Sequence, residues 1–195
     1  MIEPVLAARA RVLVVAATVR ELAPAGGWAT LCCGVGPVEA AAHTAAALAQ
    51  HRPRAVVHVG IAGARRASGL VAPQLVIGTA SRYCDLTVPE RFAPHALAID
   101  EALVAAARRA VPSAVSRVIG TSGTVGQSSG CEVEAMEGFA VLRACALAGV
   151  PAIEVRAISN AIEDTDRALW RFDEAFDAIV RVTPALVDEV AACAS

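Results

Sequence analysis

The sequence predicts an α/β fold of three layers, in which a twisted, mostly parallel or mixed central sheet is flanked by helices. Short runs rich in Val and Ile alternate along the chain with longer runs of helical character, an order typical of layered α/β proteins. The run over residues 12–16 contains no polar residue, as in a strand covered on both faces. No internal repeat, low-complexity tract or linker divides the chain, so residues 1–195 are predicted to form one domain, in which residues 1–10 could be an N-terminal extension.

The first half of the chain contains four predicted strands and one helix. The first strand covers residues 12–16, a continuous apolar run, and a short second strand covers residues 28–33. A turn then leads into a helix over residues 38–50. Pro37 occupies a first helical position, where its missing N–H is not needed. The next two strands are predicted over residues 55–60 and 74–78.

The second half continues the alternation. A helix over residues 99–111 is stopped by Pro112, and a strand over residues 116–120 follows. The next helix starts around Met136 and Glu137 and runs to about residue 148, where Gly149 provides a left-handed cap. The remaining elements are a strand over residues 152–160 and a closing helix over residues 170–192, with a kink or break expected near Pro184.

Composition excludes several classes of function. The net charge of −2 and the pI of about 6.1 give no electrostatic reason to expect nucleic acid as a partner. No apolar stretch approaches the roughly 18 residues of a membrane span, and no signal peptide is evident, so we expect a cytoplasmic protein without a membrane partner. The chain has no Lys, which removes lysine Schiff-base chemistry and a P-loop lysine.

Cysteine and histidine positions do not suggest a metal site. The six Cys are irregularly spaced without a C-x-x-C pair, so we expect buried thiols rather than a zinc site or a disulfide framework. The four His also lack metal-ligand spacing. His58, inside a predicted strand, is interpreted as a core histidine with satisfied hydrogen bonds rather than as a catalyst.

Glycine and polar residues follow several predicted strands. Gly60-Ile-Ala-Gly63 and Thr121-Ser-Gly-Thr124 each come after a strand, and the strand over residues 152–160 ends in Ser159-Asn160. In an open α/β sheet, ligands bind in the crevice outside the carboxyl ends of the strands. These endings therefore predict one pocket, which Met136 and Glu137 can also face. The earlier Gly34-Val-Gly36 lacks the third glycine of a dinucleotide fingerprint, so we interpret it as a tight turn.

Glu21 follows the first predicted strand and leaves two interpretations open. It is a solvated carboxylate near a helix N-terminus, or it belongs to the crevice if the first strand ends there.

Three motifs in order, Gly60-Ile-Ala-Gly63, Glu134-Ala-Met-Glu-Gly138 and Val155-Arg-Ala-Ile-Ser-Asn160, resemble the nucleoside phosphorylase/nucleosidase superfamily. The resemblance extends from residue 11 to about residue 182 and is strongest to futalosine hydrolases, with methylthioadenosine/S-adenosylhomocysteine nucleosidases next. It implies a nucleoside phosphorylase-like fold, a purine nucleoside as the small-molecule partner, and N-glycosidic bond hydrolysis without a metal or redox cofactor. It also implies a homodimer or a higher homo-oligomer, with Tyr83 and Asp85 in a stretch near the subunit contact.

The resemblance also implies roles for individual residues. Glu21 would activate the attacking water, and Asn160 would contact the purine leaving group. Met136 would lie against the ribose, and Glu137 would accept hydrogen bonds from the ribose hydroxyls. The other residues implied in substrate binding are Gly60, Ile61, Ala62, Gly63, Thr121, Ser122, Gly123, Glu134, Arg156 and Ser159.

Asn160 favours a particular base. Adenine-releasing relatives carry Asp at this position, which can donate a proton to N7, whereas an amide cannot act as an acid and its NH₂ can donate only a hydrogen bond. The resemblance therefore favours a 6-oxopurine nucleoside, most of all futalosine, which would give hypoxanthine and dehypoxanthine futalosine in menaquinone biosynthesis. Three alternatives stay open: a methylthioadenosine/S-adenosylhomocysteine nucleosidase, a 6-oxopurine nucleoside phosphorylase, and a degenerate nucleoside-binding protein without activity.

Two further features of the sequence concern which molecule, water or phosphate, attacks the sugar, and how the pocket for the purine base is built. Phosphate binding needs several Arg at the first and third strand ends, and the early loop offers only Arg20, so water is the expected acceptor. Relatives usually carry a short extra helix between the positions of Gly123 and Glu134. Here only about ten residues separate them, and residues 126–130 are expected to form a short loop. Trp170 and Phe172 could belong to a lid or simply pack the last helix.

Overall fold

A computed structural model describes residues 7–126 and 130–194. Within them, eight strands form one sheet. The strands are β1 (Val12–Ala16), β2 (Ala29–Cys32), β3 (Ala55–Ala64), β4 (Leu75–Tyr83), β5 (Ala96–Ala98), β6 (Val115–Thr121), β7 (Val133–Ala135) and β8 (Ala152–Ala161). The α-helices are α2 (Pro37–His51), α3 (Glu101–Ala110), α4 (Gly138–Leu147) and α5 (Phe172–Cys193), and the short 3₁₀ helices are η1 (Val19–Glu21), η2 (Arg66–Ser68) and η3 (Arg167–Leu169).

The sheet is mixed, as predicted, and part of it closes on itself. Strands β2, β1, β3 and β8 are parallel neighbours in that order. Strand β8 then pairs antiparallel with β4, β4 pairs parallel with β6, and β6 pairs parallel with β7. Strand β7 returns to pair antiparallel with β3, so β3, β8, β4, β6 and β7 form a closed ring. Strand β5 adds an outer strand to β4.

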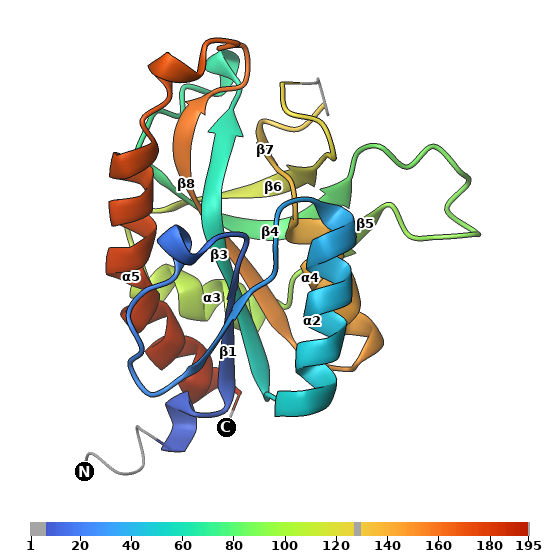
Figure 1. The fold of residues 1–195 in the computed structure, drawn as a ribbon, viewed down its shortest axis with the longest axis vertical. Helices are drawn as coiled ribbons and strands as arrows, with labels where there is room; N and C mark the ends of the chain where they lie inside the picture. Colours follow the sequence, from blue (N-terminus) through green and yellow to red (C-terminus); the bar gives the residue numbers. More distant parts are fainter. Residues whose placement is uncertain (1–6, 127–129, 195) are drawn as a thin grey trace.

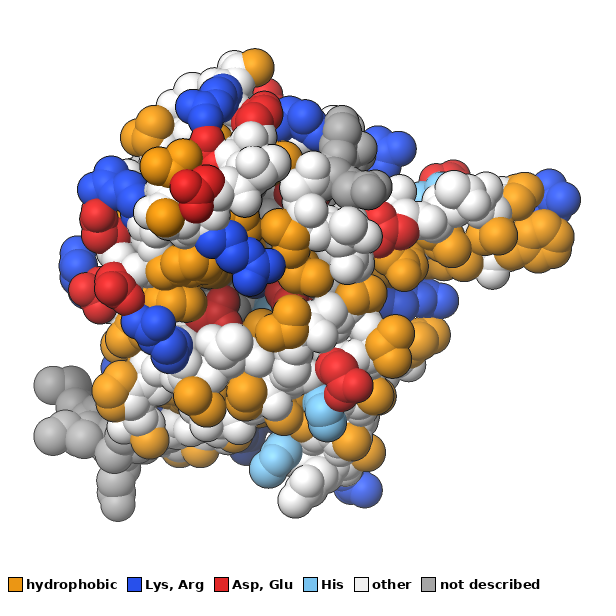
Figure 2. All heavy atoms as spheres, turned by 45° about the horizontal axis from the view of Figure 1, so that its top comes forward, with side chains coloured by type: hydrophobic (Ala, Val, Ile, Leu, Met, Phe, Trp, Pro, Cys, Tyr) orange, Lys and Arg blue, Asp and Glu red, His pale blue; other side chains and the backbone are white. Residues whose placement is uncertain are grey.

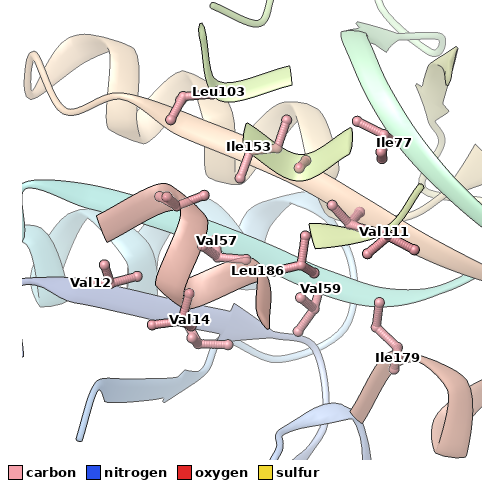
Figure 3. Packing of buried hydrophobic residues seen from close by; sticks show 14 of the residues in the cluster. Val12, Val14, Val57, Val59, Ile77, Leu103, Val111, Ile153, Ile179 and Leu186 are labelled. Carbon is pink, nitrogen blue, oxygen red and sulfur yellow. The ribbon is translucent and has the colours of Figure 1, made fainter. Parts of the chain in front are cut away.

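Helices cover the sheet on two sides, which confirms the predicted layers (Figure 1). Helices α3 and α5 pack together on one side, and α2 and α4 pack together on the other. Strand β1 is buried throughout because its side chains alternate between these sides. Val12 and Val14 join the cluster with α3 and α5, part of which is drawn in Figure 3, whereas Leu13 and Val15 join the cluster with α2 and α4.

Most predicted elements are present, with boundaries that differ by a few residues. The short strands β5 and β7 were not predicted, because three residues are too few to show a period of two. Helix α5 runs through Pro184 without a break. It keeps its course because apolar residues on both sides of Pro184, including Ile179 and Leu186, are buried in the same cluster, and packing outweighs one lost backbone hydrogen bond. Gly149 has a positive φ of 68° after α4, as expected for its left-handed cap.

The prediction that the strand over residues 55–60 ends at residue 60, with the glycine motif following it, is wrong. Residues 60–63 lie inside β3, which continues to Ala64 because β8 pairs with it along its whole length. The register shifts between Ala62 and Gly63. The absence of a side chain at Gly60 serves packing instead: a Cβ there would lie 2.3 Å from Arg156 Nη1.

Candidate active site

A cavity of about 410 Å³ opens at the carboxyl ends of β1, β3 and β8. Figure 2 shows a hollow with acidic side chains in its depth, surrounded by apolar and basic side chains. Glu21, Met136, Glu137 and Asn160 all line the cavity. The predicted convergence of these side chains on one crevice is therefore what the structure shows.

Glu21 is buried at the floor of the cavity, with 3% of its surface exposed. It ends the short helix η1 that follows β1. Its Oε2 accepts hydrogen bonds from the backbone N–H and the hydroxyl of Thr18, both at 2.8 Å. Its Oε1 accepts from the backbone N–H of Ile61 at 3.1 Å. The interpretation of Glu21 as a solvated carboxylate is thus wrong, since two donors from Thr18, at the start of η1, and one from Ile61 in β3 hold the carboxylate in the cavity.

Glu137 lies at the start of α4 and faces the same floor. Its Oε1 accepts a hydrogen bond from the backbone N–H of Gly36 at 3.0 Å, and its Oε2 lies 3.6 Å from Arg156 Nη1. Burial raises the pKa of the Glu137 carboxyl, and the nearby Glu21 and Glu154 raise this pKa further. Arg156 and the Gly36 N–H oppose the rise. A carboxylate at this place can accept hydrogen bonds from two ribose hydroxyls, although burying its negative charge costs free energy.

Asn160 is presented at the end of β8. The hydroxyl of Ser159 lies 2.8 Å from its Oδ1, and its Nδ2 donates to the carbonyl of Ala161 at 2.9 Å. An amide nitrogen carries two N–H groups, so one of them is left for a ligand in the cavity. The arrangement presents Asn160 as a hydrogen-bond donor.

A buried ionic network lies behind the floor of the cavity. Arg156 is fully buried and makes an ion pair with Glu154, with 2.9 Å between Nε and Oε1. Its Nη2 also donates to Nε2 of His58, whose Nδ1 lies 3.0 Å from the carbonyl of Val15. His58 is therefore the satisfied core histidine that the sequence predicted. The sequence reasoning missed Glu154, although a carboxylate two residues before Arg156 in a strand rich in Ile and Val was a signal.

Other predicted site residues divide into two groups. Those that line the cavity are Ile61, Ala62, Gly63, Glu134, Met136 and Ser159. Those that do not line it are Gly60, Thr121, Ser122, Gly123 and Arg156.

The structure gives a physical reason for each residue that lies off the cavity. Gly60 and Arg156 pack against each other behind the floor. The hydroxyl of Thr121 accepts a hydrogen bond from the backbone N–H of Phe139 at 2.7 Å. Ser122 and Gly123 both donate hydrogen bonds to the carboxylate of Asp85.

An aromatic wall, which the sequence suggested only in part, closes one side of the cavity. Trp170, Phe172 and Phe176 line it, with ring centroids 5.3 Å apart for the first pair and 6.1 Å apart for the second. Arg167 also lines the cavity and lies over the Trp170 ring. Thr124, Val125 and Gly126 contribute from the short loop whose residues 127–129 lie outside the described part.

The described residues, 7–126 and 130–194, contain neither a cluster of metal ligands nor a membrane-spanning helix. No group of three or more His, Cys, Asp or Glu among them is arranged to hold a metal ion. The helices described are all too short or too polar to cross a membrane.

Comparison with known proteins identifies the family. A sequence model described as the phosphorylase superfamily matches residues 25–192. The chain belongs to the phosphorylase superfamily. A curated relative from Streptomyces coelicolor, named futalosine hydrolase, is 35% identical over 188 residues, covering 82% of this chain and 80% of the relative. A futalosine hydrolase from Thermus thermophilus is 43% identical over 60 residues, which are 31% of this chain and 27% of the relative.

Solved structures of this superfamily share the fold. A futalosine hydrolase mutant of Helicobacter pylori has a TM-score of 0.80 at 17% identity, over 91% of this chain and 98% of the other. A methylthioadenosine/S-adenosylhomocysteine nucleosidase of Streptococcus pneumoniae, in complex with 8-aminoadenine, has a TM-score of 0.79 at 19% identity, over 91% and 98%. Glu21 precedes the region that the family model matches, so its place in the cavity rests on the structure alone.

Proposed function

We propose that this chain is a purine nucleosidase that hydrolyses the N-glycosidic bond of futalosine, releasing hypoxanthine and dehypoxanthine futalosine in menaquinone biosynthesis. The observation that carries the proposal is the meeting of Glu21, Glu137 and Asn160 in one cavity. The curated relatives named futalosine hydrolase support the choice of nucleoside.

In this proposal each of the three residues has one task. Glu137 accepts the ribose hydroxyls, with Met136 against the sugar. As the bond between C1′ and N9 breaks, its electron pair goes to the base, and the sugar passes through an oxocarbenium-like state. Glu21 accepts a proton from the water that attacks C1′. The Asn160 N–H donates a hydrogen bond to the base as negative charge develops there, and the base takes its proton from solvent.

Asn160 supports the choice of a 6-oxopurine. Its Oδ1 already accepts a hydrogen bond from the Ser159 hydroxyl, and one N–H of its Nδ2 is left to donate to the base. A donor suits N7 or the 6-oxo oxygen of hypoxanthine. The 6-amino group of adenine is itself a donor, so it cannot pair with this N–H.

The charges around the cavity support water rather than phosphate as the acceptor. Among the described residues that line it, Arg167 is the only basic one, whereas Glu21, Glu134 and Glu137 are acidic. A phosphate dianion beside these carboxylates would be repelled, and binding it needs several Arg. Arg156 offsets this negative charge only in part, because its partner Glu154 adds a further carboxylate behind the floor.

The test is a panel of futalosine, inosine, methylthioadenosine and S-adenosylhomocysteine, each with and without phosphate, with the released base quantified by chromatography. We expect hypoxanthine from futalosine at a rate that does not depend on phosphate. Faster release of adenine from methylthioadenosine would assign the chain to the other nucleosidases. Dependence on phosphate would make it a phosphorylase, and binding without turnover would make it a degenerate binder.

We also propose that the chain acts in the cytoplasm as a homodimer or a higher homo-oligomer. The segment between β4 and β5 projects far from the body of the molecule (Figure 1). It carries exposed apolar side chains, with Phe92 70% and Val88 40% exposed. A projecting arm with such side chains is suited to contact with a second copy. Light scattering with size-exclusion chromatography tests this, and Phe92→Glu is expected to shift the population toward monomer.

A further inference from the structure

The guanidinium of Arg156 is held on two sides and faces the cavity floor on a third. Its Nε donates to Glu154, and its Nη2 donates to His58. Its Nη1 lies 3.6 Å from Glu137 Oε2 and has no hydrogen-bond partner among the described residues. The contacts with Glu154 and His58 therefore determine where Nη1 of Arg156 lies.

His58 can accept a hydrogen bond from Arg156 because a backbone carbonyl determines the tautomer of its ring. Its Nδ1 lies 3.0 Å from the carbonyl of Val15, which can only accept, so Nδ1 carries the proton. The lone pair of Nε2 is then directed at Arg156. Burial and the charge of Arg156 lower the pKa of His58 well below its usual value, so the ring stays neutral and able to accept.

Two glycines leave space for this network. A Cβ at Gly138 would lie 2.1 Å and 2.3 Å from the two carboxylate oxygens of Glu154. A Cβ at Gly60 would lie 2.3 Å from Arg156 Nη1 and 2.8 Å from Glu21 Oε1. Nη1 and the Glu21 carboxylate thus rest against one glycine, so the network adjoins both carboxylates of the cavity floor.

The position of the Arg156 guanidinium matters because its positive charge lies close to several buried carboxylates. Burial alone lowers the pKa of Arg156, but Glu154, Glu137 and Glu21 raise it by more, so the guanidinium stays charged. It offsets the repulsion among these carboxylates only while it stays close to them. We propose that His58 and Glu154 are positioning residues, which hold the Arg156 guanidinium behind the carboxylates of Glu21 and Glu137. Neither lines the cavity, so neither is proposed to touch substrate.

Two substitutions separate positioning from mere structural support. His58→Phe keeps a ring but removes the acceptor for Nη2, so Arg156 can move away and the pKa of Glu137 rises. Glu154→Gln keeps an acceptor for Nε but removes a negative charge that raises the pKa of Glu137, so this pKa falls. The other groups that act on Glu137, namely Glu21, Cys33 and the Gly36 N–H, are unchanged in both variants.

The experiment is a ¹³C NMR titration of the Glu137 carboxyl, assigned with Glu137→Gln, together with kcat and KM for futalosine against pH. We expect shifts of opposite sign in H58F and E154Q. We also expect kcat/KM at pH 7 to fall roughly 10- to 100-fold in H58F, as for the loss of a hydrogen bond to a charged group. His58→Gln, which retains an acceptor near Nε2, is the matched control and should keep activity within about threefold of the parent.

An unmoved Glu137 titration in both variants, or shifts of the same sign, would overturn the positioning role. If H58F does not fold, Glu154→Leu is compared with E154Q, because both lack the charge of Glu154 and only Gln keeps an acceptor for Nε. A higher Glu137 pKa in E154L than in E154Q supports the proposal, and an equal or lower pKa overturns it. The kinetic readout rests on the proposed function, whereas the titration does not. A chain without nucleosidase activity but with opposite shifts would therefore refute the proposed function and leave the positioning role standing.

Discussion

Replacing Gly60 with Ala adds one methyl group where the buried network meets the cavity floor. The new Cβ would lie 2.3 Å from Arg156 Nη1, where ordinary contact begins at 3.4 Å, so the guanidinium would have to withdraw by about 1 Å. It cannot do so freely, because Glu154 and His58 hold its other nitrogens. Forcing a methyl group into such a site destabilises a protein by about 1–3 kcal/mol.

The same methyl group would lie 2.8 Å from Glu21 Oε1, so the carboxylate of Glu21, the proposed general base, must shift as well. A displacement of about 1 Å in a catalytic arrangement can lower the rate roughly 100-fold. We therefore expect Gly60→Ala to lose about two orders of magnitude in kcat for futalosine. Hypoxanthine release measures activity, and urea unfolding followed by circular dichroism measures stability.

Gly78→Ala is the matched control, because Gly78 is also a strand glycine and its added Cβ would come no closer than 3.2 Å to any atom. It should cause a smaller loss of stability and leave kcat near that of the parent. Parent-like stability and activity in Gly60→Ala would show that Arg156 and Glu21 move aside easily. The reasoning that Gly60 is needed for a tightly held network would then be wrong.

Three further predictions concern single residues. Glu21→Gln should lower kcat by roughly 10²- to 10⁴-fold, as for loss of a general base, while calorimetry still detects nucleoside binding; unchanged kcat would remove Glu21 from the mechanism. Asn160→Asp should raise adenine release from methylthioadenosine relative to hypoxanthine release from futalosine by about tenfold or more, and an unchanged ratio in a competition assay would show that the base is chosen elsewhere. Because the pKa of His58 is depressed in the folded state, its contribution to stability is present above about pH 6.5 and is lost below it by up to about 1.4 kcal/mol per pH unit. Urea titrations at pH 7.5 and 5.5 should show a smaller loss in His58→Gln, and equal losses would contradict a buried neutral imidazole.

The fold was largely predictable from local patterns, because most strands and helices are long enough to show their period. The run over Val12–Ala16 and the proline that begins α2 led directly to the observed elements. The closed pairing from β3 around to β7 was not predictable, since it depends on contacts between distant segments. The same contacts explain why residues 60–63 extend a strand instead of following it: β8 supplies partners that a local reading of glycines does not include.

The site was predictable where a residue type indicated a chemical role and the ends of the predicted strands indicated its location. Met136, Glu137 and Asn160 were placed in one crevice on these grounds, and they do line one cavity. The position of Glu21 could not be decided from sequence, because its burial depends on donors from Thr18 and from Ile61, which lies 40 residues away. Glu154 was overlooked because a strand pattern shows which residues are buried but not which of them pair.

The buried network gives a physical reason for acidic residues to be gathered in a cavity that is closed to bulk water at its floor. Glu21 and Glu137 in the cavity and Glu154 behind its floor would repel one another, and each loses hydration on burial. A single Arg156 offsets part of this repulsion, but its own partner Glu154 adds to the negative charge it must compensate. The site therefore keeps excess negative charge beside the sugar. Such charge favours an oxocarbenium-like sugar, which cleavage by water or by phosphate would share, and it disfavours a phosphate dianion, which separates a hydrolase from a phosphorylase.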